Sequence, residues 1–384
     1  MDQDGAARLL DARDRFFAWL RDAAYPLWWA TGLDRQGAGF FEKIAADGHA
    51  LSGPRRARVL GRQIYSFSQA PRLGWTGPVE AAVQHGLAAL PAFLRDDGLT
   101  RPLVSDDGIP GEGRPDLYDQ AFTLFGLAHA LPFVADPAPL AAQAAAIRQA
   151  LTNSLSHPVA GFEEASPRVL PLRANPHMHL LEAALAWEAV SDDPAWTAMA
   201  DGIVELALAR FIDPATGALH EFFDGDWNRM SGDLAVVEPG HQFEWGWLLL
   251  RWGILRGRAD ARAVATRLIA IGETHGLDPV RGVLFGELNP DLTVRDPVAR
   301  LWPQTERIKA WVLTAQTCDD PAAADEAHGR AADAVEALMR YFRSDLPGSW
   351  FDRMTADGQL IEEPAPASSL YHIVCAAAVL ADHA

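Results

Sequence analysis

The stretch NPHMHLLEAALAWEAV, residues 175–190, indicates most clearly which fold this chain adopts. Its apolar residues recur at spacings of three and four, which is the period of an α-helix. Asn175 is a good N-cap for that helix, and Pro176 suits its first turn. Most of the polar side chains lie near the start of the helix, so this end is predicted to face a functional surface.

Five other segments carry the same period, namely Arg62–Trp75, Leu117–Val134, His241–Leu255, Trp302–Thr317 and Ser368–Ala381. A second set, richer in Ala and charged residues on one face, alternates with them at Ala7–Trp29, Pro78–Arg95, Leu140–Leu155, Ala195–Phe211, Ala259–His275 and Ala322–Arg343. The first set begins at 62, 117, 175, 241, 302 and 368, and these intervals suit a helical hairpin plus a long loop. The twelve helices predict an all-α fold, an (α/α)6 barrel of six helical hairpins formed by residues 1–384 as a single domain. An open α-solenoid is the structural alternative.

Short Gly-marked stretches with strand-like residues follow the second-set helices, such as GFFE at 39–42, GALHE at 217–221 and GSWF at 348–351. Several lead into turn pairs, for example Asp47-Gly48 and Asp224-Gly225, that favour hairpins. They predict short β-hairpins or loops gathered at the mouth of the barrel.

Composition excludes several classes of partner. The 51 acidic against 33 basic residues give a formal charge of −18, which repels nucleic acid and anionic membranes. No apolar run reaches the ~18 residues of a membrane span, and the N-terminus lacks the order of a signal peptide. Cys318 and Cys375 show no metal-type spacing. We therefore expect a cytoplasmic protein without nucleic-acid or membrane partners, and a homo-oligomer is compatible with this.

Chemically active side chains gather near the starts of the strongly periodic helices. Arg62, Tyr65 and Gln69 lie on one stripe at i, i+3 and i+7. Asn175 and His179 share a face at i, i+4, and Glu182 extends that face to i+7. Such polar stripes on otherwise apolar helices predict a shared site.

Two His-x-x-Glu pairs raise the question of a metal. His177 and His179 sit about 200° apart around a helix, so they do not bind one ion together. His241 and Glu244 share a face at i, i+3, but the usual helix-bundle metal signature runs Glu-x-x-His. We therefore predict that no metal is bound, with Glu244 acting near a histidine that handles protons.

An aromatic ring and a carboxylate share a face on the fifth periodic helix. Trp302 and Glu306 are spaced at i, i+4, which suits a ring that stacks on a sugar and an acceptor for its hydroxyl groups. The last helix carries His372. Together these residues predict a carbohydrate site.

The motifs of all six periodic helices together resemble the N-acylglucosamine 2-epimerase superfamily, and most of all its bacterial D-mannose isomerase branch. They are RQIYSF (62–67), DLYDQAF (116–122), NPHMHLLE (175–182), PGHQFEW (239–245), RLWPQTE (300–306) and YH (371–372). The resemblance implies an (α/α)6 barrel without metal or cofactor, in which His241 and His372 act as general acid and base. By motif position, the implied sugar-binding residues are Arg62, Tyr118, Asn175, His179, Glu244, Trp302 and Glu306.

Two departures from the family motifs narrow the range of expected substrates. The cellobiose and N-acylglucosamine epimerases that this chain resembles usually carry a Trp shortly before the last histidine, whereas this chain has Ala367. The cellobiose epimerases also carry a Trp-Trp pair before Pro-Gln, and here Leu301 stands in place of the first Trp. The resemblance thus favours isomerisation of free D-mannose and D-fructose through a cis-enediolate. A sugar 2-epimerase of the mannose/glucose, N-acylglucosamine or cellobiose type is the first alternative. A glycoside hydrolase on the same barrel and a non-catalytic sugar-binding protein are the others.

Overall fold

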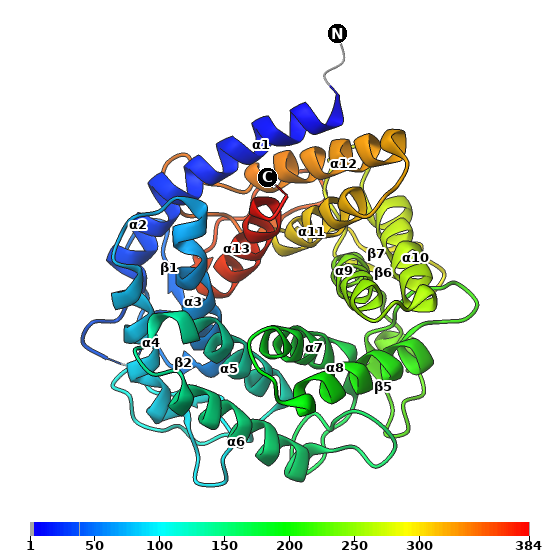
Figure 1. The fold of residues 1–384 in the computed structure, drawn as a ribbon. Helices are drawn as coiled ribbons and strands as arrows, with labels where there is room; N and C mark the ends of the chain where they lie inside the picture. Colours follow the sequence, from blue (N-terminus) through cyan, green and yellow to red (C-terminus); the bar gives the residue numbers. More distant parts are fainter. Residues whose placement is uncertain (1–3, 38, 384) are drawn as a thin grey trace.

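The computed structural model describes residues 4–37 and 39–383, and it confirms the predicted (α/α)6 barrel. Figure 1 looks along the barrel axis and shows two concentric rings of helices. The inner ring consists of α3 (Ala57–Gln69), α5 (Leu117–Ala130), α7 (Ala174–Glu188), α9 (Pro239–Leu255), α11 (Trp302–Gln316) and α13 (Ala367–Ala381). These are the strongly periodic segments of the sequence.

The outer ring covers the inner one with helices that expose one face. It consists of α1 (Gly5–Trp19), α2 (Tyr25–Leu27), α4 (Val79–Phe93), α6 (Ala138–Leu155), α8 (Pro194–Leu206), α10 (Ala259–Gly276) and α12 (Pro321–Met339). Short π-helical turns (Leu20–Ala24, Trp28–Gly32 and Ala207–Phe211) and 3-10 turns (Ala70–Leu73, Leu131–Phe133 and Gly232–Leu234) extend or join these helices. The carboxylates of Asp4, Asp193 and Asp320 accept hydrogen bonds from the first-turn N–H groups of α1, α8 and α12. Local caps therefore fix the starts of these three outer helices.

The ring is closed, which excludes the open solenoid. The last inner helix, α13, packs against the first, α3, and α1 packs against α12. Two strands join the same seam, because β1 (Lys43–Ile44) pairs with β10 (Ala365–Pro366) in antiparallel register. Close helix contact also needs Gly61, where an added Cβ would lie 2.0 Å from the carbonyl oxygen of Phe122.

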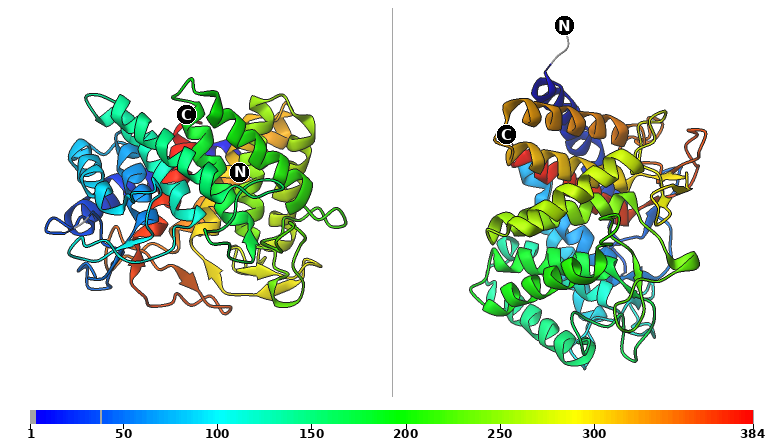
Figure 2. Two further views of the ribbon diagram at one scale, coloured as in Figure 1. Left: turned by 90° about the horizontal axis from the view of Figure 1, so that it is seen from below. Right: turned by 90° about the vertical axis from the view of Figure 1, so that its right-hand side faces the viewer.

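The remaining strands gather at one end of the barrel, as Figure 2 shows. They pair as β2 (Arg55–Arg56) with β3 (Leu103–Val104), β4 (Leu172–Arg173) with β5 (Phe222–Phe223), β6 (Glu287–Leu288) with β7 (Val294–Asp296), and β8 (Ala299–Arg300) with β9 (Arg353–Met354). The strands β2, β4, β8 and β10 lead directly into inner helices. The N-terminal ends of those helices therefore open on the strand-lined mouth, as predicted.

Several helix boundaries differ by a few residues from the sequence prediction, and the start of the first inner helix is one of them. The helix expected to begin at Arg62 begins at Ala57, five residues earlier. Its first turn is capped from another helix, because the backbone N–H of Arg58 donates to the carboxylate of Asp119 at 3.1 Å. Spacing along the chain gives no sign of such a cap.

Within the described part of the chain, no helix is both long and apolar enough to cross a membrane.

Candidate active site

A small polar cavity of about 150 Å³ lies at the mouth end of the barrel, where the inner helices begin. Every inner helix contributes to its wall, and every lining residue carries a polar side-chain atom. The lining residues are Arg62, Tyr118, Asn175, His179, Glu238, His241, Glu244, Arg300, Trp302, Ser368, Ser369 and His372. The structure thus brings together eight of the nine residues expected from the sequence. The ninth, Glu306, lies directly behind His372.

His241 is held by carboxylates from two segments. Its Nδ1 lies 2.9 Å from Oε2 of Glu221 and 3.7 Å from Oε2 of Glu238. Burial lowers the pKa of His241, but the charges of Glu221 and Glu238 outweigh burial and raise that pKa to about 10. His241 is therefore an imidazolium at neutral pH.

His372 has the opposite electrostatic setting. Burial lowers its pKa well below the ordinary value, and the positive charges of Arg62 and Lys309 lower it further. Its Nδ1 lies 2.9 Å from Oε1 of Glu306. When that hydrogen bond is donated by Nδ1, the other ring nitrogen is free to accept a proton.

Trp302 stands between the two histidines. Its ring centroid lies 5.0 Å from that of His241 and 5.5 Å from that of His372. The close approach of α9 to this ring requires Gly240, because an added Cβ there would lie 2.5 Å from the indole. A ligand in the cavity would therefore meet an aromatic face with an imidazole at each side.

Several buried polar atoms of the cavity wall have no hydrogen-bond partner among the described residues. They include Nε of Arg62 and both carboxylate oxygens of Glu244. Burying such atoms unpaired is costly, so a site that leaves them unpaired is suited to a polar ligand that completes them. Arg62 is placed by Tyr118, whose hydroxyl accepts from Nη2 at 2.7 Å, and by Phe122, whose ring centroid lies 4.0 Å from its guanidinium carbon.

The floor of the cavity is a buried layer of charged and polar groups. Nδ1 of His179 lies 3.5 Å from Glu182 and 3.9 Å from Glu244, and the hydroxyl of Tyr371 donates to Glu182. Burial lowers the pKa of His179 to about 3 even though Glu182 opposes this shift. His179 is therefore neutral at pH 7.

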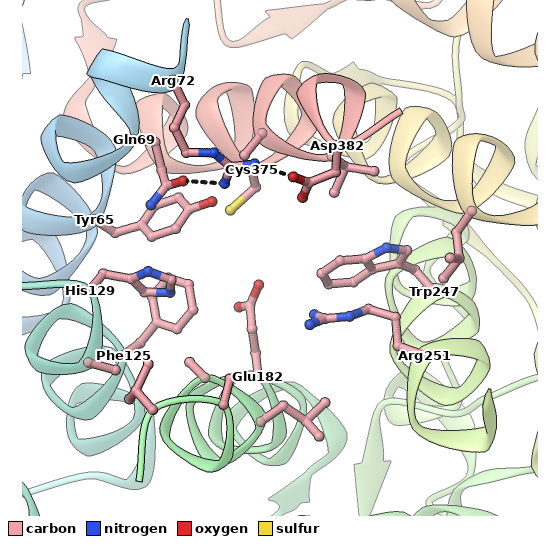
Figure 3. Close-up of a pocket in the computed structure, with 18 of the residues that line it drawn as sticks. Tyr65, Gln69, Arg72, Phe125, His129, Glu182, Trp247, Arg251, Cys375 and Asp382 are labelled. Atoms are coloured by element: carbon pink, nitrogen blue, oxygen red, sulfur yellow. Dashed lines mark hydrogen bonds and ion pairs between the residues drawn. The ribbon is translucent and has the colours of Figure 1, made fainter. Parts of the chain in front are cut away.

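A second cavity, of about 320 Å³, lies beyond this floor at the opposite end of the barrel (Figure 3). Tyr65 and Gln69 line it, together with Glu182 and Arg251. The polar stripe expected on one helix is therefore divided between two cavities. Only Arg62 faces the cavity with the histidines, because the stripe runs along the barrel axis.

The geometric argument about His177 and His179 is confirmed. Nδ1 of His177 donates to the carbonyl of Arg173, and its Nε2 accepts from the N–H of Phe162, both at 3.0 Å and away from the cavity. Three other groups of side chains nevertheless place possible metal ligands within 4.8 Å of one another. They are His179, Glu182 and Glu244; Glu221, Glu238 and His241; and Glu244, Glu306 and His372. A metal-free reaction therefore remains a prediction.

Sequence reasoning missed several residues that shape the site. Glu238, Arg300, Ser368 and Ser369 adjoin predicted residues in the chain, so their proximity to the starts of inner helices was a usable signal. Glu221 comes from the segment before β5, and no local pattern links it to His241. Lys309 follows Glu306 by three residues on α11, a spacing that brings two side chains together on a helix.

Comparison with known proteins places the chain among the sugar isomerases and 2-epimerases, so it is an enzyme. It belongs to the N-acylglucosamine 2-epimerase family, whose model matches residues 39–376. The family and fold expected from the motifs are thereby confirmed, and a non-catalytic binding protein is excluded.

Two relatives and one solved structure show the range of this similarity. The chain is 44% identical over 369 residues to the mannose-6-phosphate isomerase of Rhizobium meliloti (strain 1021), with 95% of each chain covered. It is 24% identical over 358 residues to the cellobiose 2-epimerase of Bacteroides fragilis, which covers 87% of this chain and 89% of that one. A crystal structure of D-mannose isomerase matches with a TM-score of 0.84 at 19% identity, covering 95% and 97% of the two chains. The last similarity shows a shared fold.

Proposed function

We propose that this enzyme interconverts free D-mannose and D-fructose through a cis-enediolate, with His372 as the base on carbon and His241 as the acid on oxygen. The opposite charge states of these two histidines carry the proposal. His241 beside Glu221 and Glu238 holds a proton to give, and buried His372 has a nitrogen ready to take one.

The reaction follows from these charge states. His241 donates its proton to the ring oxygen as the C1–O5 bond breaks, and its imidazole takes up the proton of the anomeric hydroxyl group, so the ring opens and the aldehyde forms. His372 then removes the proton from C2, and the electrons of that C–H bond form the enediolate. His372 returns the same proton to C1 while a proton passes from the C2 oxygen to O1, a transfer that the imidazole of His241 can carry, and the product is the ketose.

The negative charge that develops on the substrate oxygen meets positive groups in the cavity. Arg62 supplies a guanidinium, and the inner helices direct their positive N-terminal ends toward the same space. Asn175 and Glu244 offer hydrogen-bonding atoms to the hydroxyl groups, and Trp302 offers a stacking face.

The size of the cavity supports a monosaccharide. Its volume of about 150 Å³ is roughly half the lower end of the ~300–1,000 Å³ typical of sites for larger ligands. Ala367 and Leu301 stand where the cellobiose epimerases that the sequence resembles have Trp, so a platform for a second sugar ring is not expected. We also propose that the chain acts as a single domain in the cytoplasm without a metal or cofactor.

The name of the Rhizobium meliloti relative makes mannose 6-phosphate a second candidate substrate. Arg300 is the residue suited to meet a phosphate, because it lines the mouth and its Nη2 lies 3.8 Å from Asp352, beyond hydrogen-bond distance. Glu238 lines the same cavity beside Arg300, and its carboxylate opposes the binding of a dianion. We therefore favour the free sugar.

A product assay tests both points. The enzyme is incubated separately with mannose and with mannose 6-phosphate, and kcat/KM is measured for each. We expect fructose as the initial product from mannose and a lower kcat/KM for the phosphate ester. A higher kcat/KM for mannose 6-phosphate, lost on Arg300→Ala, would transfer the proposal to the phosphorylated sugar. Glucose as the initial product from mannose would instead support a 2-epimerase in which both histidines act on opposite faces of C2.

A further inference from the structure

Lys309 is a fully buried cation below the catalytic cavity, and the reaction as described does not use it. It lies on α11 one turn after Glu306, and its Nζ is 2.5 Å from Oε2 of Glu306. The same Nζ is 3.9 Å from Oε1 of Glu244 and 4.2 Å from the ring centroid of Trp247. A buried ammonium is costly unless it is paired, so its place in the core calls for a specific partner.

Glu306 connects this lysine to a histidine of the cavity. One carboxylate oxygen faces Nζ of Lys309, and the other lies 2.9 Å from Nδ1 of His372. The hydroxyl oxygen of Thr305 lies 3.1 Å from that second oxygen. Two short contacts thus link Lys309 in the core through Glu306 to His372 in the substrate cavity.

We propose that Lys309 is a positioning residue that keeps Glu306 ionised and thereby fixes the proton of His372 on Nδ1, so that Nε2 is the base. An ionised carboxylate only accepts hydrogen bonds, so a neutral His372 beside it must carry its proton on Nδ1. A protonated Glu306 would itself donate to Nδ1. The imidazole proton would then move to Nε2, and no nitrogen would be left to take the C2 proton.

The surroundings of Glu306 show why a cation is needed. The charged or titratable groups on the elements packed around it are Glu182 on α7, Glu244 on α9, Lys309 on α11, and Tyr371, His372 and Cys375 on α13. Burial raises the pKa of Glu306, and the charge of Glu182 raises it further, while Lys309 acts against both. Without Lys309, Glu306 and Glu244 would be two buried carboxyl groups with no nearby ammonium, and Glu306 would take up a proton from solvent.

The inference rests on the proposed function only for the role of His372 as a base, so the first readout does not depend on turnover. The ¹⁵N chemical shifts of His372 distinguish the nitrogen that carries hydrogen from the one that does not. In wild-type protein at pH 7 we expect hydrogen on Nδ1. In Lys309→Met we expect hydrogen on Nε2, whereas Lys309→Arg, which keeps the charge, should restore the wild-type pattern in part.

The second readout is kinetic. Lys309→Met should lower kcat for mannose at pH 7 by roughly 10²-fold, within the range for loss of an acid–base group, and leave KM little changed. The activity of the Lys309→Met variant should rise with pH, because Glu306 ionises as the pH increases. In the Glu306→Gln background the same substitution should have almost no further effect on kcat, because the carboxylate that Lys309 acts on is absent.

Several results would overturn the proposal. They are hydrogen on Nε2 of His372 in the wild-type protein, unchanged ¹⁵N chemical shifts of His372 in Lys309→Met, or a change in the KM of Lys309→Met without a change in its kcat. Lys309→Gln replaces Lys309→Met if circular dichroism shows that the latter does not fold, and the wild-type spectrum is decisive by itself. If the histidine pattern shifts as expected but wild-type enzyme does not convert mannose, the positioning role stands and the proposed function fails.

Discussion

Replacing Glu221 with glutamine tests how the charge of His241 is set. Glu221 and Glu238 lie 2.9 and 3.7 Å from Nδ1 of His241 and raise its pKa to about 10, against an ordinary value of 6.5. The difference, 10 − 6.5, is about 3.5 pH units. At ~1.36 kcal/mol per unit it corresponds to roughly 5 kcal/mol in favour of the imidazolium.

Glu221 is the nearer and the more deeply buried of the two carboxylates. Glu221→Gln should therefore remove about half of this energy, roughly 2–3 kcal/mol, and move the alkaline limb of kcat/KM from near pH 10 to about pH 8. Glu238→Gln is the matched control. Its shift should be smaller, because Glu238 is 0.8 Å farther from Nδ1 and its side chain is 24% exposed.

The assay is ketose formation from mannose between pH 6 and 11, with an NMR titration of His241 alongside. Stability gives an independent check. Because the folded pKa of His241 lies above its unfolded value, the proton stabilises the fold fully below about pH 6.5, and this contribution is lost as pH rises toward 10. Wild-type protein should thus lose more unfolding free energy than Glu221→Gln over that range. A common alkaline limb for wild type and Glu221→Gln would refute the reasoning.

Three further predictions concern the cavity. Activity should survive exhaustive chelation, and loss of turnover that returns with one divalent ion would show that one of the three ligand groups binds a metal. Trp302→Ala should raise KM by an amount equivalent to about 1–3 kcal/mol with the thermal unfolding curve unchanged, and an unaltered KM would make Trp302 a packing residue. His372→Asn should abolish both conversion and exchange of the C2 proton in deuterated water, by a factor of order 10²–10⁴. His241→Asn should slow conversion but retain C2 exchange on substrate supplied in the open-chain form, and exchange at the wild-type rate in His372→Asn would contradict this division of roles.

The fold and much of the cavity follow from patterns that are local in the sequence. A helix presents residues three and four apart on one face, so the pairs Asn175/His179 and His241/Glu244 can be identified from the sequence alone. Once six such helices form a ring, their starts converge, and the residues near those starts meet. The motifs therefore predicted which residues gather, although not what each of them contacts.

The electrostatics of the cavity depend on contacts that no local pattern records. Glu221 reaches His241 from a strand-leading segment 20 residues away. The spacing of Glu306 and Lys309 at i, i+3 is ordinarily that of an exposed ion pair, and only the closed ring makes it a buried one. The charge of a histidine follows from such partners and from burial, and both are properties of the assembled barrel.

The seam between α13 and α3 has a kinetic consequence. Ile44 pairs with Ala365, a sequence separation of 321 residues (365 − 44), so almost the whole chain must be folded back before the two strands meet. Contacts of such sequence separation form late and slowly. Because His372 lies on α13 and Arg62 on α3, an intermediate with an open seam would have its helices but an incomplete cavity, without the guanidinium of Arg62 near His372. During refolding we therefore expect the far-ultraviolet dichroism of the helices to return first and turnover to return later. The recovery of turnover would then report the closure of the ring.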